Sequence, residues 1–369
     1  MNVVICGAGA IGASIAYYLA RKGVGATVVE RSAVACAASG HSGGFLALDW
    51  CRGSPVDALA RRSFQLHKDL ARELDVDWGY RCLDTLGVLA SDSRDFSTYG
   101  RVEAPAWLDA EIGVHGQLGT IQTTAQVHPA GFTRTMMDVA VAAGTKIVIG
   151  VVEGIALGGG GTRVSGVIVD GETIAADTAV IAMGPWSILA CQWLPLPATH
   201  GLKGHSFVFR YQPPEPHALF VEFETSRGEV DSPEVFPRTD GTTYVCGARG
   251  AAALPVDPAM VQPEEAPSER LLDQVRRFAP ALGSSEILEV NACYRPITKD
   301  GLPLMGPVPG VSGAYVATGH SVWGILNAPA SGEAMAELLV DGVSAIDLTA
   351  FDPGRLPILD ASEVSNTMP

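Results

Sequence analysis

The sequence has few basic residues and no long apolar run, and each lack removes a class of function. Lysine and arginine together number 25 against 40 aspartates and glutamates, so the formal net charge is −15. Nucleic-acid binding requires a basic surface that neutralises phosphates, and no nucleic-acid partner is therefore expected. No run of about 18 apolar residues free of charge occurs, so we also expect no membrane span.

Cysteine pairs are missing as well. The seven cysteines form no Cys-x-x-Cys pair and stand mostly in apolar segments. That pattern fits neither a zinc site nor a disulfide framework, and it favours reduced, buried thiols without a bound metal. The first apolar segment starts almost directly after Met1, with no signal peptide or transit segment before it, so we expect a cytoplasmic protein.

The beginning of the chain predicts a dinucleotide site. An apolar segment, residues 3–6, leads into a Gly-x-G-x-x-G turn at Gly7, Gly9 and Gly12 and then into a helical segment. The glycines permit a tight turn, a close approach of the backbone to a pyrophosphate, and close packing of helix on strand. A second apolar segment ends in Glu30, 18 residues after Gly12, where a carboxylate that holds a ribose hydroxyl is expected.

The rest of the chain predicts two domains. A length of 369 residues with 47% hydrophobic and 18% charged residues indicates a globular protein with more than one core. Four glycines at 158–161 predict a hairpin tip, and a buried strand follows at 178–184. Between 199 and 291 the alternation of apolar residues is typical of antiparallel strands. Apolar periodicity predicts helices at 57–74, 130–143, 267–278 and 331–341.

Five separated segments together resemble one family, the flavin-dependent oxidases and dehydrogenases related to D-amino acid oxidase, glycine oxidase and sarcosine oxidase. The resemblance spans nearly the whole chain. The segments are the opening glycine motif with Glu30-Arg31, the loop Ser39-Gly40-His41-Ser42-Gly43-Gly44, Val127-His128-Pro129, residues 182–187 (Ala-Met-Gly-Pro-Trp-Ser), and the C-terminal residues 293–303 with Gly319-His320 and residues 323–329.

The resemblance implies an α/β fold like that of D-amino acid oxidase, with a Rossmann-type FAD-binding domain and a β-rich, antiparallel substrate domain. We expect a discontinuous FAD-binding domain at residues 1–75, 124–198 and 293–350. The substrate domain is expected at 76–123 and 199–292, followed by a C-terminal tail at 351–369.

The resemblance also implies that the cofactor is FAD. Glu30 is expected to hold the adenosine ribose, the loop from Ser39 the phosphates and ribityl chain, and Val152 the adenine through its backbone. Backbone N–H donors from residue 319 onward are expected at the flavin pyrimidine end, where they stabilise charge on the reduced ring. The expected cofactor-binding residues are Gly7, Gly9, Ala10, Ile11, Gly12, Glu30, Arg31, Ser39, His41, Ser42, Gly43, Val152, Gly184, Trp186, Gly319, His320, Gly324, Ile325 and Leu326.

For the substrate, the resemblance singles out Arg295, whose planar guanidinium suits a carboxylate. His205, Tyr244 and His320 are candidate pocket liners. Glycine oxidases carry a second arginine after the Gly-His pair, whereas this chain has Ser-Val-Trp at 321–323, so glycine is not the expected substrate.

Two residue types bear on how the cofactor is held and reoxidised. Cys293 stands where sarcosine oxidase relatives attach flavin covalently, but Arg-Pro follows shortly after it, so non-covalent FAD is the first expectation and a thioether at Cys293 the second. Those relatives also place a lysine near the flavin, where it assists the reaction with oxygen. The matching residues 242–247 of this chain contain no lysine, and Lys203 and Lys299 are the nearest in sequence. Oxygen and another electron acceptor therefore both remain open.

The implied reaction is oxidation of the C–N bond of a small amino acid or secondary amine to an imine. Oxidation of a 2-hydroxy acid fits Arg295 equally, but an alcohol usually needs a base that removes its proton, and no such base is evident. A flavoprotein with an assembly or scaffold role is a third hypothesis. The sequence gives no oligomeric state.

Overall fold

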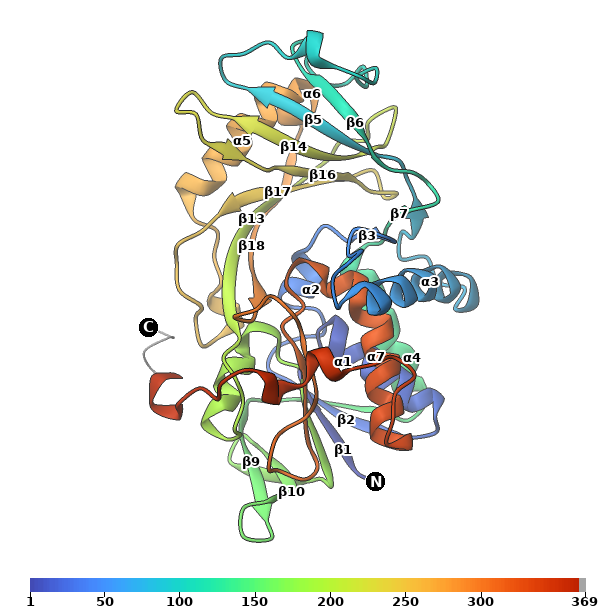
Figure 1. Cartoon of the computed structure of the whole chain (residues 1–369), viewed down its shortest axis with the longest axis vertical. Helices are drawn as coiled ribbons and strands as arrows, with labels where there is room; N and C mark the ends of the chain where they lie inside the picture. The colour runs from blue at the N-terminus through green and yellow to red at the C-terminus, as the bar shows by residue number, and fades with distance from the viewer. Residues whose placement is uncertain (365–369) are drawn as a thin grey trace.

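A computed structural model describes residues 1–364, so the end of the predicted tail, residues 365–369, lies outside the described residues. One half of the molecule is built on a six-stranded sheet (Figure 1). Its strands are parallel except for β19 at one edge. In spatial order they are β19 (Leu304–Pro307), β20 (Ala314–Thr318), β12 (Thr178–Ile181), β1 (Val3–Cys6), β2 (Ala26–Glu30) and β8 (Lys146–Ile149).

Both faces of the middle of this sheet are covered, which is why β1 and β12 are buried at every position. In β1, Val3 and Ile5 belong to the core beneath the helices, whereas Val4 and Cys6 belong to the core on the opposite face. The helical face is covered by α1 (Ala10–Arg21), α4 (Pro129–Ala142) and α7 (Gly324–Asp341), with α3 (Asp57–Glu73) packed on α7.

The opposite face carries a three-stranded antiparallel sheet. The glycine-rich segment at 158–161 forms the tip of the predicted hairpin between its first two strands. The strands are β9 (Val152–Gly158), β10 (Arg163–Val169) and β11 (Glu172–Ala175), and the 3-10 helix η2 (Gly184–Gln192) packs against the same core.

The other half is an eight-stranded, mostly antiparallel sheet; only β14 and β5 pair in parallel. The path is β18 (Ile287–Ile297), β13 (His200–Phe209), β17 (Thr243–Arg249), β16 (Glu234–Pro237), β14 (Ala218–Glu224), β5 (Thr85–Ser91) and β6 (Gly113–Gly119), with β15 (Val230–Asp231) beside β14. Phe207 and Phe209 share a core with Leu271 and Phe278 of α5 (Glu265–Phe278), which α6 (Pro280–Gly283) follows.

Long strands connect the two halves. Figure 1 shows β13 and β18 running from the eight-stranded sheet down toward the six-stranded one. The expected boundary between residues 292 and 293 falls inside β18, which continues in the same sheet to Ile297. A fourth, three-stranded sheet of β3 (Phe45–Ala47), β7 (Thr124–Gln126) and β4 (Arg81–Cys82) lies at the junction, and α2 (Ala38–His41) packs on β18.

The last helix begins earlier than its periodicity predicts, at Gly324 instead of residue 331, and it contains Pro329. Proline lacks the N–H that would bond the carbonyl four residues earlier, here Ile325. His67 of α3 takes that place, with its Nε2 2.9 Å from the Ile325 oxygen. Ser63 on the same helix accepts from the Ala330 N–H at 3.0 Å, so α3 supplies partners that a sequence window cannot reveal. Within residues 1–364, no helix is both long and apolar enough to cross a bilayer.

Candidate cofactor and substrate site

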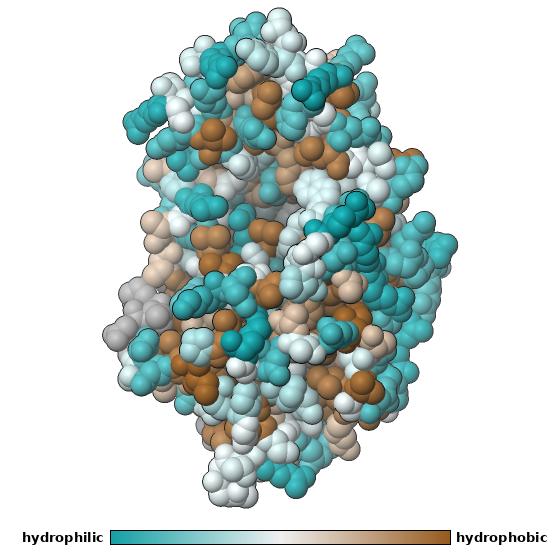
Figure 2. All heavy atoms as spheres, in the orientation of Figure 1, coloured by the Kyte–Doolittle hydropathy of each residue, from teal (hydrophilic) through white to brown (hydrophobic). Residues whose placement is uncertain are grey.

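One cavity lies between the two large sheets. Figure 2 shows the surface hollowed between the parts of the molecule built on them. The walls come from the carboxyl ends of β1, β2, β12 and β20 on one side and from β13, β16, β17 and β18 on the other. The carboxyl ends of parallel strands are where such sheets bind ligands.

The glycine turn forms the part of the wall at the start of α1. Gly7 has φ +107°, and a Cβ on it would lie 2.5 Å from the Ala182 oxygen. Gly12 faces the Gly7 carbonyl so closely that no side chain fits between them. Gly9, the N-cap of α1, has no side chain and no acidic residue follows it in the first turn. The positive end of the helix therefore faces the cavity without an acidic side chain from its own first turn, which favours a phosphate there.

Glu30 ties the turn to the end of β2. Its carboxylate accepts from the Ala8 N–H at 2.8 Å and from the Ser32 N–H at 3.1 Å, and the side chain lines the cavity. Ser39 lies opposite and accepts from the Ala10 N–H at 2.9 Å. These bonds hold the turn, the end of β2 and the loop after it in one fixed arrangement.

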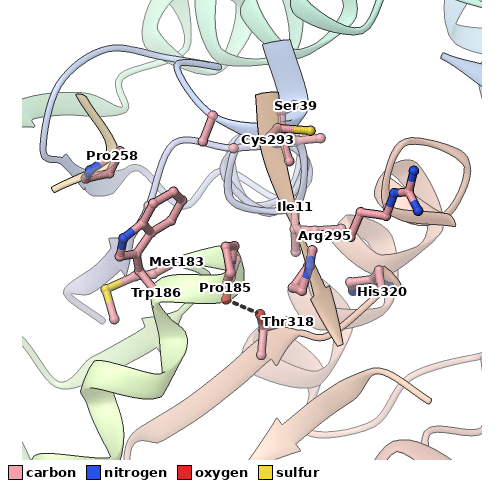
Figure 3. A pocket seen from close by; sticks show the side chains of 18 of the residues that line it. Ile11, Ser39, Met183, Pro185, Trp186, Pro258, Cys293, Arg295, Thr318 and His320 are labelled. Atoms are coloured by element: carbon pink, nitrogen blue, oxygen red, sulfur yellow. Dashed lines mark hydrogen bonds between the residues drawn. The ribbon is translucent and has the colours of Figure 1, made fainter. Parts of the chain in front are cut away.

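Trp186 and Arg31 hold a segment of the second half over one end of the cavity. The Trp186 indole Nε1 donates to the Pro255 carbonyl at 2.7 Å. Arg31 lies 3.5 Å from the Asp257 carboxylate, and Val256 and Pro258 complete the wall. Figure 3 shows Trp186 and Pro258 on one side of the pocket and Arg295 and His320 on the other. Val152, the first residue of β9, lines the cavity with Gly150 and Val151 and packs against the same core as Trp186.

Arg295 and Glu234 place opposite charges at the other end. Arg295 on β18 lies over Gly204 of β13, whose missing side chain leaves room for the guanidinium: a Cβ there would be 3.2 Å from Nη2. Within residues 1–364, no carboxylate or carbonyl accepts a hydrogen bond from Arg295. Burial raises the pKa of Glu234, while the nearby Arg295 guanidinium acts in the opposite direction.

The two candidate histidines differ in whether protein groups already bond their ring nitrogens. His205 is held at both nitrogens, with Nδ1 3.1 Å from the Ala248 oxygen and Nε2 accepting from the Glu264 N–H at 2.9 Å. His320 is 3% exposed, and neither of its nitrogens has a partner within residues 1–364. Burial lowers the pKa of His320 to about 3, so its ring is neutral at ordinary pH. An unpartnered, buried ring facing a cavity indicates a ligand there.

Tyr244 and Cys293 also face the cavity. The Tyr244 hydroxyl donates to the His41 carbonyl at 2.8 Å, and burial raises its pKa well above the ordinary value. Burial likewise raises the pKa of the Cys293 thiol, although Arg295 acts in the opposite direction, so the thiol is protonated at neutral pH. Neither Lys203 nor Lys299 lines this cavity; Lys203 pairs with Glu264 at 3.0 Å.

The structure gathers most of the residues singled out from the sequence around this one cavity. Three of them do not line it: Gly12 packs under the turn, Leu326 is buried in the helical core, and His41 offers its carbonyl to Tyr244. The lining residues are Gly7, Gly9, Ala10, Ile11, Glu30, Arg31, Ser39, Ser42, Gly43, Val152, Gly184, Trp186, Gly319, Gly324 and Ile325, together with His205, Tyr244, Arg295 and His320.

The sequence did not single out several other lining residues, among them Glu234, Cys246, Thr318 and Pro258. Thr318 directly precedes Gly319-His320, and its hydroxyl donates to the Gly184 carbonyl at 2.9 Å. Glu234 is the one acidic residue in an otherwise apolar segment between two prolines, and that contrast was its only signal.

Comparison with known proteins gives a consistent picture. The family model described as FAD dependent oxidoreductase matches residues 2–338. A protein named as an oxidoreductase, C1F5.03c of Schizosaccharomyces pombe, is 29% identical over 95% of this chain and 97% of its own length. Glycine oxidase of Bacillus licheniformis is 28% identical over 92% of this chain and 93% of its own.

Solved structures share the fold. Glycine oxidase from Geobacillus kaustophilus superposes with a TM-score of 0.77 at 22% identity, covering 96% of this chain and 98% of its own. Iminodiacetate oxidase from Chelativorans sp. BNC1 gives a TM-score of 0.77 at 19% identity, covering 95% of this chain and 99% of its own.

Proposed function

Because the chain belongs to the family of FAD-dependent oxidoreductases that includes the amino acid oxidases, we propose that it oxidises the C–N bond of a small amino acid or secondary amine to an imine. The observation that carries the proposal is Arg295, a half-buried cation that faces the cavity and has no hydrogen-bond or ion-pair partner within residues 1–364. A carboxylate is the natural complement of such a guanidinium.

The residues present fit FAD. Gly7 and Gly9 leave the start of α1 open to a pyrophosphate, and Glu30 stands at the end of β2, where a ribose hydroxyl is expected. The unpartnered His320 and the backbone after Gly319 face the far end of the same cavity. These residues would hold the cofactor, with Val152 beside the adenine and Gly184 and Trp186 along its length.

When bound, FAD supplies an acceptor for the hydride that leaves the substrate α-carbon. The chain contributes orientation: Arg295 would fix the carboxylate, so that the α-carbon has one position relative to the walls. His320 and Tyr244 are neutral at ordinary pH and can exchange hydrogen bonds with the substrate nitrogen without adding a charge. The imine leaves the site and is hydrolysed by water.

The test is the visible spectrum of the purified protein without oxygen, before and after addition of amino acids of both chiralities, N-methyl amino acids and 2-hydroxy acids. Loss of colour with one class of amine supports the proposal. Loss of colour only with 2-hydroxy acids would assign the rival reaction, and a yellow protein that no compound bleaches would favour a scaffold role.

We also propose that FAD is bound without a covalent bond, since Arg295-Pro296 follows Cys293 and burial raises the pKa of the thiol. Acid precipitation should then leave the yellow colour in the supernatant, whereas a thioether would keep it in the pellet. Recolouring of the reduced protein in air, compared with recolouring by an artificial dye, distinguishes oxygen from another acceptor.

A further inference from the structure

Glu234 and Arg295 are opposite charges that share a cavity but do not pair. Glu234 is on β16 and Arg295 on β18, with β13 and β17 between them, and in the register of these strands Glu234 lies level with Asn291, four residues before Arg295. Both side chains line the cavity. No Arg295 nitrogen lies within 4.0 Å of the Glu234 carboxylate, although the two are close enough to act on each other electrostatically.

Protein groups leave Glu234 nearly unsatisfied. Within residues 1–364, its carboxylate accepts only from the Cys246 thiol, at 3.5 Å, and a thiol is a weak donor. A carboxylate removed from bulk water is costly unless a cation or several donors complete it. Arg295 likewise has no acceptor in this described part of the chain, so the cavity presents an acidic and a basic side chain that protein groups leave open.

We propose that Glu234 binds a protonated amino group of the substrate while Arg295 binds its carboxylate, and that the amino group passes this proton to the Glu234 carboxylate before the hydride leaves the α-carbon. This inference rests on the proposed function for the identity of the site, and it adds that the enzyme selects compounds carrying both charges. A carboxylic acid without an amino group would bind Arg295, but its carboxylate would be repelled by the unpaired carboxylate of Glu234. Glu234 is thus a specificity residue that disfavours 2-hydroxy acids.

The test compares two ligands that differ only in the amino group. The holoenzyme is titrated with 2-aminoisobutyrate, which lacks the α-hydrogen needed for oxidation, and with isobutyrate, and each Kd is taken from the change in flavin absorbance or from calorimetry. Because no turnover is required, the measurement remains valid if no amine reduces the flavin. Glu234→Gln removes the charge and keeps the shape, and Glu222→Gln, an exposed residue of the same sheet, is the matched control.

We expect Glu234→Gln to weaken 2-aminoisobutyrate binding at least about tenfold and to strengthen isobutyrate binding, since a charge-assisted bond is lost in one case and a repulsion in the other. Glu222→Gln should change neither constant. Equal changes for both ligands would mean that Glu234 only positions Arg295, and no change would mean that it does not meet the ligand. Either result, or tighter binding of isobutyrate than of 2-aminoisobutyrate by the unaltered protein, overturns the proposal.

Discussion

Replacing Arg295 tests the carboxylate assignment most sharply. Arg295→Met keeps an unbranched side chain as long as the arginine stem up to Nε and removes every donor, and Gly204 beneath it leaves space for the change. A paired, charge-assisted contact of a guanidinium with a carboxylate involves two bonds of about 1.5–3 kcal/mol each. The substrate carboxylate would then also face Glu234 without a neutralising cation. We expect a loss of about 3–4 kcal/mol, or about 10²–10³-fold in kcat/KM.

Arg295→Lys provides the graded control. Lysine keeps the charge but not the planar pair of donors, so we expect a loss of about tenfold. The assay is the rate of flavin bleaching without oxygen over a series of substrate concentrations, together with the flavin-to-protein absorbance ratio. The reasoning is refuted if Arg295→Met loses its flavin while the substrate dependence of the remaining holoenzyme is unchanged.

Three further substitutions probe the turn, the ribose position and a buried histidine. Gly7→Ala places a Cβ 2.5 Å from the Ala182 oxygen at φ +107°, so flavin content and Tm should both fall. Gly23 has φ +75° but lies in open space, so Gly23→Ala should lower the free energy of unfolding by only about 1–2 kcal/mol and retain FAD. Equal effects of the two substitutions would contradict this. Glu30→Ala leaves the buried Ala8 N–H without an acceptor, which should cost about 1–3 kcal/mol of stability and raise the Kd for FAD; an unchanged Kd by fluorescence titration would count against the ribose assignment. Burial lowers the pKa of His67 to about 4, so between pH 6.5 and 4 the unfolded chain binds a proton that the folded chain does not. The free energy of unfolding should therefore fall with acidification by up to about 1.4 kcal/mol per pH unit from this group, and chemical denaturation of His67→Gln should show a shallower fall; identical slopes would exclude His67.

Local patterns predicted most of the fold because the strands and helices carry their own periodicity. The unit of β1, α1 and β2 lies at the predicted place, and the hairpin of β9 and β10 turns at its four glycines. The start of α7 could not be predicted, because a proline normally ends a helix and the partners that compensate for Pro329 come from α3, more than 250 residues earlier. Such compensation is a tertiary property and leaves no mark within the helix.

The candidate site divides in the same way. Residues in glycine-rich motifs, such as Gly7 and Ser39, were identified because the motif itself describes a backbone shape. Glu234 belongs to no sequence motif. It faces the same cavity as Arg295 because of the order of strands in the eight-stranded sheet, where β16 and β18 lie on either side of β13 and β17. His205 and His320 looked equivalent in the sequence, and only their hydrogen-bond partners separate them.

We infer that a C–N bond of a carboxylate-bearing amine is broken at this cavity. This inference is tested most directly by a single turnover without oxygen, in which ammonia or primary amine and the oxo acid are measured against the flavin reduced. We expect each product to appear in an amount equimolar with the flavin that is reduced. Flavin reduction that yields an oxo acid without any released amine would contradict it.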